Sequence, residues 1–257
     1  MNGFIDSHFH LLAVEQKGIN IATLLKELKD SGFEGGIDIG LSADDLPQRL
    51  KLSAMYPEIL HASAIGPWGA ALKEDISKIV SDFTNFVSDY SYQFIGEIGL
   101  DYHWNYGTKE RQKELFVSQI ELANSLNKPI IVHSRDADED TKAILDTQNF
   151  KKRGIMHCFS STEILLKSAL DKDFFISFAG PVTYKSSGAL RQMVSYVPLE
   201  NLLLETDSPY LSPEPLRGKV NTPLNISFVY EEVSKIKNIP LDKLIEQIKS
   251  NFKLLSN

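Results

Sequence analysis

The sequence predicts an α/β protein, a (β/α)8 TIM barrel with its active site at the C-terminal face of the strands, and three observations support this. Eight short β-rich segments alternate with longer segments of helical periodicity. The chain has 257 residues, close to the roughly 250 of such barrels. No GxGxxG or GxxxxGK[ST] loop follows an early strand, which disfavours a doubly wound open sheet. We therefore expect residues 1–257 to form one domain.

The predicted strands are short runs rich in β-branched and aromatic residues. Several are apolar on both faces, as in a parallel sheet covered by helices. In chain order they are Phe4–His10, Gly35–Leu41, Ile59–Ile65, Phe94–Asp101, Pro129–Arg135, Gly154–Phe159, Phe174–Ala179 and Leu202–Asp207. A closed barrel would make the first and last of them neighbours.

Helical periodicity is clearest in two segments between these strands. Ile21–Asp30 carries apolar residues at helical spacing, and Arg111–Leu126 places Leu115 and Ile120 among charged residues, which suits one buried face. A further helical tail, residues 224–255, extends past the eighth strand.

Composition excludes several classes of protein. Apolar residues make up 42% and charged residues 24% of the chain, which is ordinary globular usage and excludes a disordered or fibrous protein. The single cysteine, Cys158, excludes an internal disulfide and fits a reducing compartment. The start of the chain has no signal-peptide pattern, and no apolar run approaches the ~18 residues of a membrane helix. We expect a soluble cytoplasmic protein with no membrane contact and infer no obligatory protein partner.

The net charge of −7 argues against bulk electrostatic binding of nucleic acid. It still permits a local basic rim around a site.

Four of the six histidines fall near the C-terminal ends of predicted strands. His8 and His10 are two residues apart on the first strand, so their side chains project together while Phe9 faces the helices. His133 and His157 lie on the fifth and sixth strands. Neutral imidazole is a good ligand for zinc-like ions. The sequence therefore indicates a metal site at the mouth of the barrel.

Two carboxylates follow the same geometry, with Glu97 in the fourth strand and Asp207 at the end of the eighth. Four imidazoles and two acids exceed what one tetrahedral ion requires. They fit two divalent ions, roughly 3.5–4 Å apart, that share one carboxylate. Mixed nitrogen and oxygen ligands suit zinc, manganese or iron, with magnesium at lower affinity.

The remaining histidines and the cysteine receive structural interpretations. His61 comes early in its strand and His103 follows its strand in a loop, so both are expected to be structural or to lie on the rim. Strand alternation places Cys158 on the face opposite His157, as a small buried apolar residue.

Five segments then show a resemblance to the TatD family of metal-dependent hydrolases, within the amidohydrolase-like barrels. The segments are DSHFH (6–10), GEIGLDYHW (96–104), KPIIVHSRDA (128–137), MHCFS (156–160) and LLLETDSPYL (202–211), with RGKVNTP (217–223) similar to the loop after strand eight. Together they run from the first strand past the last.

The resemblance implies a divalent-metal phosphodiesterase, typically a deoxyribonuclease acting from a 3′ end. It implies that His8, His10, Glu97 and Asp207 hold one ion. It implies that Glu97, His133 and His157 hold the other, with no carboxylated lysine.

Two departures from the family pattern touch the substrate side. The third strand ends in IGPW (65–68) where the family has GLHP, so that Trp68 is expected to take the space of the missing histidine. Val220 stands where the loop after strand eight usually has a second basic residue.

The mechanism we expect is hydrolysis by a water whose pKa the ions lower. Asp207 would accept or orient the proton of that water. Glu205 shares the strand parity of Asp207 and could orient a ligand histidine, or be a buried ion-pair partner. Arg135 could steady a phosphate, and Asp101 could orient a basic residue.

The substrate rim is expected in the loops that follow strands seven and eight. Its basic residues would be Lys185, Arg217 and Lys219. Aromatic side chains that could stack on bases are Tyr102, Trp104, Tyr184 and Tyr210. Loop lysines are as often merely solvated, and loop aromatics often cap a barrel. The partner would be DNA or a small phosphodiester.

Two other functions remain open at the level of sequence. The same site could hydrolyse an aminoacyl ester or an amide, as in D-aminoacyl-tRNA deacylation, and the negative net charge mildly favours small substrates. A non-catalytic metal-binding barrel is the third possibility.

Overall fold

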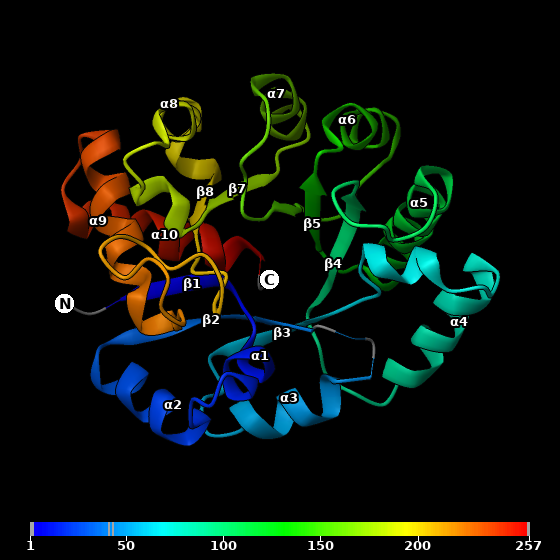
Figure 1. Cartoon of the computed structure of the whole chain (residues 1–257), viewed down its shortest axis with the longest axis horizontal. Coiled ribbons are helices and arrows are strands. Elements are labelled where there is room, and N and C mark those ends of the chain that lie inside the picture. The colour runs from blue at the N-terminus through cyan, green and yellow to red at the C-terminus, as the bar shows by residue number, and fades with distance from the viewer. Residues whose placement is uncertain (1–2, 41, 43, 256–257) are drawn as a thin grey trace.

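The computed structural model describes residues 3–40, 42 and 44–255, and its strands form one eight-stranded parallel sheet in the order β1-β2-β3-β4-β5-β6-β7-β8. The sheet curls into a nearly closed barrel, and the helices surround it (Figure 1). The predicted (β/α)8 barrel is confirmed.

The strands keep the predicted order, with ends that differ by a few residues. They are β1 (Phe4–Phe9), β2 (Phe33–Ile39), β3 (Ile59–Ser63), β4 (Phe94–Asp101), β5 (Ile130–Arg135), β6 (Ile155–Met156), β7 (Phe175–Phe178) and β8 (Leu202–Leu204). The predicted end of the second strand, Leu41, lies outside the described residues.

The helices cover the outside of the barrel. They are α1 (Leu11–Gln16), α2 (Ile21–Asp30), α3 (Leu46–Ser53), α4 (Ile76–Val87), α5 (Lys109–Leu126), α6 (Asp138–Thr147), α7 (Glu163–Asp171), α8 (Gly188–Tyr196), α9 (Ile226–Lys237) and α10 (Leu241–Leu255). None of the helices in the described part of the chain has the length and hydrophobicity needed to cross a bilayer.

Strands β6 and β8 are shorter than predicted, because β6 ends directly before His157 and β8 directly before Glu205. Cys158 and Asp207 adopt left-handed conformations, with φ of +44° and +53°. Side-chain carboxylates replace the missing ladder carbonyls: the Cys158 amide donates to Glu205 Oε1 (2.8 Å), and the Thr206 amide donates to Asp6 Oδ1 (2.9 Å). The ends of these strands are therefore built by buried acids.

The first and last strands meet, as predicted for a closed barrel. The Asp207 amide donates to the His8 carbonyl (2.9 Å), and the His10 amide donates to the Ser208 carbonyl (2.9 Å). Behind this seam, Tyr230 of α9 donates its hydroxyl to the Ile5 carbonyl (2.9 Å). The seam places Asp207 beside the two histidines of β1.

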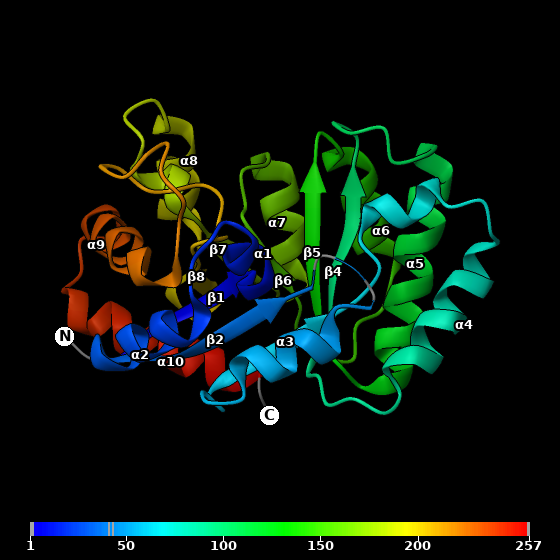
Figure 2. The ribbon, with the colours of Figure 1, turned by 60° about the horizontal axis from the view of Figure 1, so that its bottom comes forward.

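All strands point their C-terminal ends to one rim of the barrel, as the arrowheads of β4 and β5 show in Figure 2. Phe9 packs outward with Leu24 and Leu28 of α2, because strand alternation turns it away from its histidine neighbours. The outer apolar layer therefore fixes which way the polar residues of β1 face.

Candidate metal centre

The structure brings the six predicted ligand residues together at the C-terminal mouth of the barrel. A first group lies at the β1–β8 seam. His8 Nε2 is 3.3 Å from His10 Nε2, and Asp207 Oδ1 lies 3.7 Å and 3.4 Å from these two nitrogens. The three ligand atoms are close enough to share one ion.

A second group centres on Glu97 of β4. Its Oε1 lies 2.8 Å from both His133 Nδ1 and His157 Nε2, and these two nitrogens are 3.1 Å apart. Its other oxygen, Oε2, lies 3.8 Å from His8 Nε2. The Glu97 carboxylate thus has one oxygen on each side, which is the arrangement that a carboxylate shared by two ions needs.

Three of the imidazoles are oriented through the ring nitrogen that faces away from the centre. His10 Nδ1 donates to the Ile39 carbonyl (3.1 Å), which can only accept. His157 Nδ1 lies 3.4 Å from Glu205 Oε1, and His133 Nε2 lies 3.1 Å from Asp101 Oδ2. Each contact fixes a tautomer that leaves the inward nitrogen with a free lone pair, as a metal ligand requires.

The charges at the centre are strongly coupled. Burial and the neighbouring positive imidazoles hold the pKa of His8 well below its ordinary value, so this ring is neutral. Burial also lowers the pKa of His157, but the negative charges of Glu97 and Glu205 outweigh this effect and raise the pKa well above the usual value. His157 and His133 hold the pKa of Glu97 well below its usual value against the effect of burial. Without an ion, His157 therefore carries a proton, and a bound ion would displace it.

Metal binding is expected to release protons and to strengthen with pH. Because the pKa of His157 is raised, its proton stabilises the metal-free fold fully below pH ~6.5 and this contribution is lost as pH rises through the raised pKa. An ion must displace this proton, so its apparent affinity should rise up to about tenfold per pH unit for each proton displaced. Calorimetric titration with Zn²⁺ in buffers of different ionisation enthalpy measures the protons released. A binding heat independent of the buffer would contradict the prediction.

The donor set fits a divalent ion. Two sets of ligand atoms lie close enough together to hold an ion, one from His8, His10 and Asp207 and one from His8, Glu97 and His157, and their donors are imidazoles and carboxylates. Nitrogen and oxygen donors of this kind suit zinc, manganese or iron.

The predicted supporting acids lie beside the ligand groups. Glu205 is fully buried and contacts His157, as the sequence suggested for an orienting residue. Asp101 contacts His133. The sequence predicted that Asp101 orients a basic residue but did not identify which one. The pKa of Asp101 is lowered, because the interactions with His133 outweigh burial.

One buried acid at the seam was missed by the sequence analysis. Asp6 Oδ1 accepts from the His8 amide (3.2 Å), and Oδ2 accepts from the Thr206 hydroxyl (2.6 Å). Burial raises the pKa of Asp6 well above its ordinary value. Its position two residues before His8, with the same strand parity, was the available signal.

The strand alternation that was expected to turn Cys158 to the face opposite His157 does not extend to this residue. The alternation of β6 ends at Met156, and Cys158 adopts a left-handed conformation. Cys158 is half-buried, less than predicted. Burial and the negative charges of Asp207, Glu205 and Glu97 raise the pKa of its thiol well above the usual value. It belongs to neither ligand group.

The other two histidines match their structural interpretations. His61 is buried, and its Nδ1 lies 3.2 Å from Asp38 Oδ2 while its Nε2 lies 2.9 Å from Ser53 Oγ. His103 is exposed on the rim, 3.4 Å from Asp136.

The predicted substrate residues lie in exposed loops of the same face. The Arg135 guanidinium lies 5.8 Å from the ring centre of Trp104, and the Arg217 guanidinium lies 4.5 Å from that of Tyr184. Tyr210 is 6.0 Å from the His10 ring. The two remaining predicted lysines, Lys185 and Lys219, are exposed. Two cation–aromatic pairs therefore flank the ligand groups, from the β4–β5 side and the β7–β8 side.

The Trp68 indole packs against Gly66, just beyond the end of β3. A Cβ on Gly66 would lie 2.8 Å from the Trp68 indole nitrogen, so the indole fills the position of a side chain there. Val220, at the second departure, is exposed.

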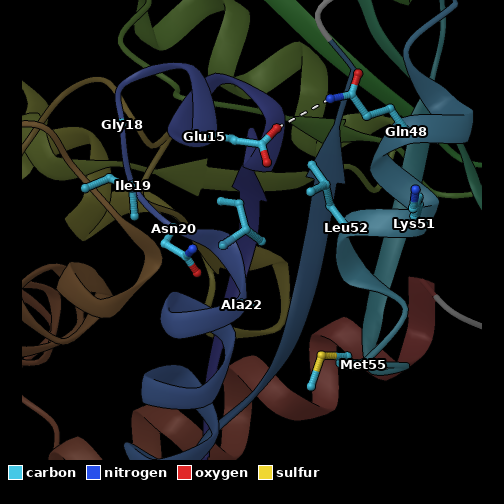
Figure 3. A pocket seen from close by; sticks show the side chains of 10 residues that line it. Glu15, Gly18, Ile19, Asn20, Ala22, Gln48, Lys51, Leu52 and Met55 are labelled. Carbon is cyan, nitrogen blue, oxygen red and sulfur yellow. Dashed lines mark hydrogen bonds between the residues drawn. The ribbon is translucent and has the colours of Figure 1, made fainter.

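Two surface hollows lie outside the ligand groups. One, of about 810 Å³, runs beside Tyr102, Lys109 and Arg135 between the loops after β5 and β6. The other, of about 700 Å³, lies between α1, α2 and α3, where Gln48 donates to Glu15 across it (3.4 Å, Figure 3). Its lining holds no histidine and one carboxylate, so it offers no chemistry comparable to the barrel mouth.

The chain is similar to known proteins over nearly its whole length. The family model described as TatD related DNase matches residues 5–257. The chain is 34% identical over 255 residues to the uncharacterized metal-dependent hydrolase YabD of Bacillus subtilis, covering 97% of each chain. It is 34% identical over 258 residues to the uncharacterized metal-dependent hydrolase YcfH of Escherichia coli, covering 96% of this chain and 93% of the relative.

Solved structures agree on the fold. The crystal structure of YJJV, a TatD homolog from Escherichia coli, superposes with a TM-score of 0.87 at 24% identity, covering 99% of this chain and 98% of that one. A TatD family hydrolase from Entamoeba histolytica gives a TM-score of 0.83 at 21% identity, covering 100% and 98%.

Proposed function

This chain belongs to the TatD family of metal-dependent hydrolases, and from that premise we propose that it is a phosphodiesterase, a deoxyribonuclease acting from a 3′ end with two divalent ions. The observation that carries the proposal is the Glu97 carboxylate, which turns one oxygen toward His8 and the other toward His133 and His157. Two ions that share a carboxylate are a recurrent solution for phosphodiester cleavage.

The residues divide between the two ions. We assign His8, His10, Glu97 and Asp207 to the first and Glu97, His133 and His157 to the second. His8 Nε2 lies almost equally far from Asp207 and from Glu97, at 3.7 and 3.8 Å. This position supports an arrangement in which the two ions are adjacent.

When bound, divalent ions lower the pKa of coordinated water and neutralise charge on substrate oxygens. We assign to Asp207 the role of taking the proton of the attacking water, because its carboxylate belongs to the first ligand group and is partly open to solvent. Glu205 and Asp101 hold the outer nitrogens of His157 and His133, so that neither ring can turn away. Arg135 is placed at the rim, where its guanidinium can grip two phosphate oxygens.

The rim supports a polymeric substrate with stacked bases. Tyr184 carries the Arg217 guanidinium on its face, and Trp104 is 54% exposed near Arg135. A base can stack on an exposed ring while the neighbouring cation binds its phosphate. A small phosphodiester would use the centre without this rim.

Replacing Lys219 with alanine tests the rim. Lys219 is exposed in the loop after β8, and its backbone carbonyl accepts from the Ser212 hydroxyl (2.5 Å). We expect Lys219→Ala to raise the KM for single-stranded DNA about three- to tenfold through a lost phosphate contact. The KM for a small chromogenic phosphodiester should stay unchanged.

The matched control is Lys26→Ala, which removes an exposed lysine on α2. It should leave both KM values unchanged. An equal rise for DNA and for the small substrate in Lys219→Ala would show that this part of the rim does not bind the polymer.

A substrate panel tests the proposed reaction. The metal-free chain is reloaded with Zn²⁺, Mn²⁺ or Mg²⁺ and assayed on 3′-labelled and 5′-labelled single-stranded DNA, RNA, a small phosphodiester and an aminoacyl ester. Metal-dependent release of nucleotides from the 3′ end supports the proposal. Ester cleavage with no phosphodiester cleavage would identify an aminoacyl-ester hydrolase instead, and no turnover with any ion would favour a binding protein.

A further inference from the structure

A cluster of buried charges lies between β2, β3 and α3, outside the proposed ligand set. Arg49 of α3 is fully buried. Its guanidinium donates to Asp38 Oδ2 (3.0 Å) and Asp45 Oδ1 (2.6 Å), and also to the carbonyls of Asp38 (3.1 Å) and Ala62 (2.8 Å). His61 adds a contact to Asp38 Oδ2 at 3.2 Å.

Burying such charges is expensive, and a buried ion pair is often no more stabilising than apolar residues of the same volume. The cluster is nevertheless well satisfied. Burial alone would raise the pKa of Asp38, but the positive charge of Arg49 and the hydrogen bond with His61 outweigh it and lower this pKa, which keeps the carboxylate ionised. A costly, fully bonded arrangement calls for a role beyond packing.

The cluster contacts the metal centre through two neighbouring residues of β2, which bind the two residues that follow β1 at the start of α1. Asp38 Oδ1, the oxygen that does not bind Arg49, accepts from the Leu11 amide (2.9 Å). The next residue on β2, Ile39, accepts from His10 Nδ1 with its carbonyl (3.1 Å). Two parallel hydrogen bonds therefore clamp the His10–Leu11 segment against Asp38–Ile39.

We propose that the Arg49–Asp38 pair positions the imidazole of His10. Arg49 fixes the Asp38 carboxylate and, through the Asp38 carbonyl, the end of β2. The end of β2 then holds the Nδ1 side of His10, so that Nε2 points at His8 and Asp207. Arg49 acts from the outside of the barrel on one ligand of the first group, and touches none of the second.

The inference rests on the proposed two-ion site, and it predicts an effect confined to one ion. In Asp38→Asn the side chain keeps its shape, but if its oxygen stays on the Leu11 amide its NH2 group faces the donors of Arg49. The clamp should loosen, and affinity for the ion at His8, His10 and Asp207 should fall about ten- to a hundredfold. Affinity at Glu97, His133 and His157 should change less than about threefold.

The test is a double-mutant cycle read by metal binding. The metal-free full-length wild type, Asp38→Asn, His10→Ala and the double variant are titrated with Zn²⁺ against a chelating indicator. If Asp38 acts through His10, Asp38→Asn weakens binding in the wild type and has no further effect in His10→Ala. The control is Asn251→Ala, which removes buried hydrogen bonds to the carbonyls of Leu199 and Leu202 at the opposite end of β8 and should lower thermal stability while sparing both affinities.

Two results would overturn the positioning role: unchanged zinc affinity in Asp38→Asn, or an equal further loss in the His10→Ala background. If Asp38→Asn fails to fold, Arg49→Lys replaces it, because lysine keeps the charge but cannot make the forked contacts. A wild type that binds a single ion refutes the two-ion proposal separately. The cycle then decides the positioning role on that ion.

Discussion

Replacing Asp207 with asparagine is expected to lower kcat by about 10²- to 10⁴-fold while most of the bound metal is retained. The amide oxygen of asparagine can still face the nitrogens of His8 and His10, which lie 3.7 and 3.4 Å from Asp207 Oδ1. It cannot accept the proton of the attacking water. The backbone should be preserved, because Asp207 has φ of +53° and asparagine, like aspartate, tolerates the left-handed region. Steady-state kinetics together with metal analysis of the same sample measures both effects.

The chain offers a matched control for this substitution. Asp136 has φ of +54°, is exposed and lies in the loop after β5. Asp136→Asn makes the same chemical change in the same backbone conformation and should leave kcat unchanged. A kcat of Asp207→Asn near that of the wild type would remove Asp207 as the proton acceptor.

Replacing Glu97 with glutamine is expected to reduce the bound ions from two per chain toward one and to lower kcat at least about 10²-fold, since metal stabilisation of the transition state is worth several kcal/mol. Glutamine has one acceptor oxygen in place of two. It can serve either His8 or the pair His133 and His157, but not both sides. Elemental analysis after dialysis gives the stoichiometry.

Glu121→Gln, an exposed change on α5, is the control and should keep both the metal content and the turnover of the wild type. Two tightly bound ions in Glu97→Gln would mean that the carboxylate is not shared.

Much of the fold could be predicted from the sequence, because local patterns are enough to order the strands. The helix Ile21–Asp30 and the strand Phe94–Asp101 were predicted with their observed ends. Closure of the barrel then follows from the fold class, and closure alone puts Asp207 beside β1. Strand parity was sufficient for His8, in β1, and for His10, the residue directly after it.

The same parity argument failed where strands end early. Beyond Met156 and Leu204 the amides of Cys158 and Thr206 donate to buried acids in place of strand carbonyls, and Cys158 and Asp207 are left-handed, so alternation no longer gives the direction of a side chain. Cys158 is the residue for which this mattered.

The sequence also did not predict which buried polar side chains contact one another. Asp101 was expected to orient a basic residue, but the choice of His133 depends on the register between β4 and β5. The Arg49–Asp38 contact depends on how α3 packs over β2, and no short-range pattern encodes that packing. Such partners become visible only when the helices are placed on the sheet.

The two-ion centre can be tested by the anomalous scattering of a crystal grown with Mn²⁺. We expect two peaks at the barrel mouth, about 3.5–4 Å apart, one bordered by His8, His10 and Asp207 and the other by His133 and His157. The Glu97 carboxylate should lie between them. A single peak, or a Glu97 side chain turned away from either set, would contradict the shared two-ion centre.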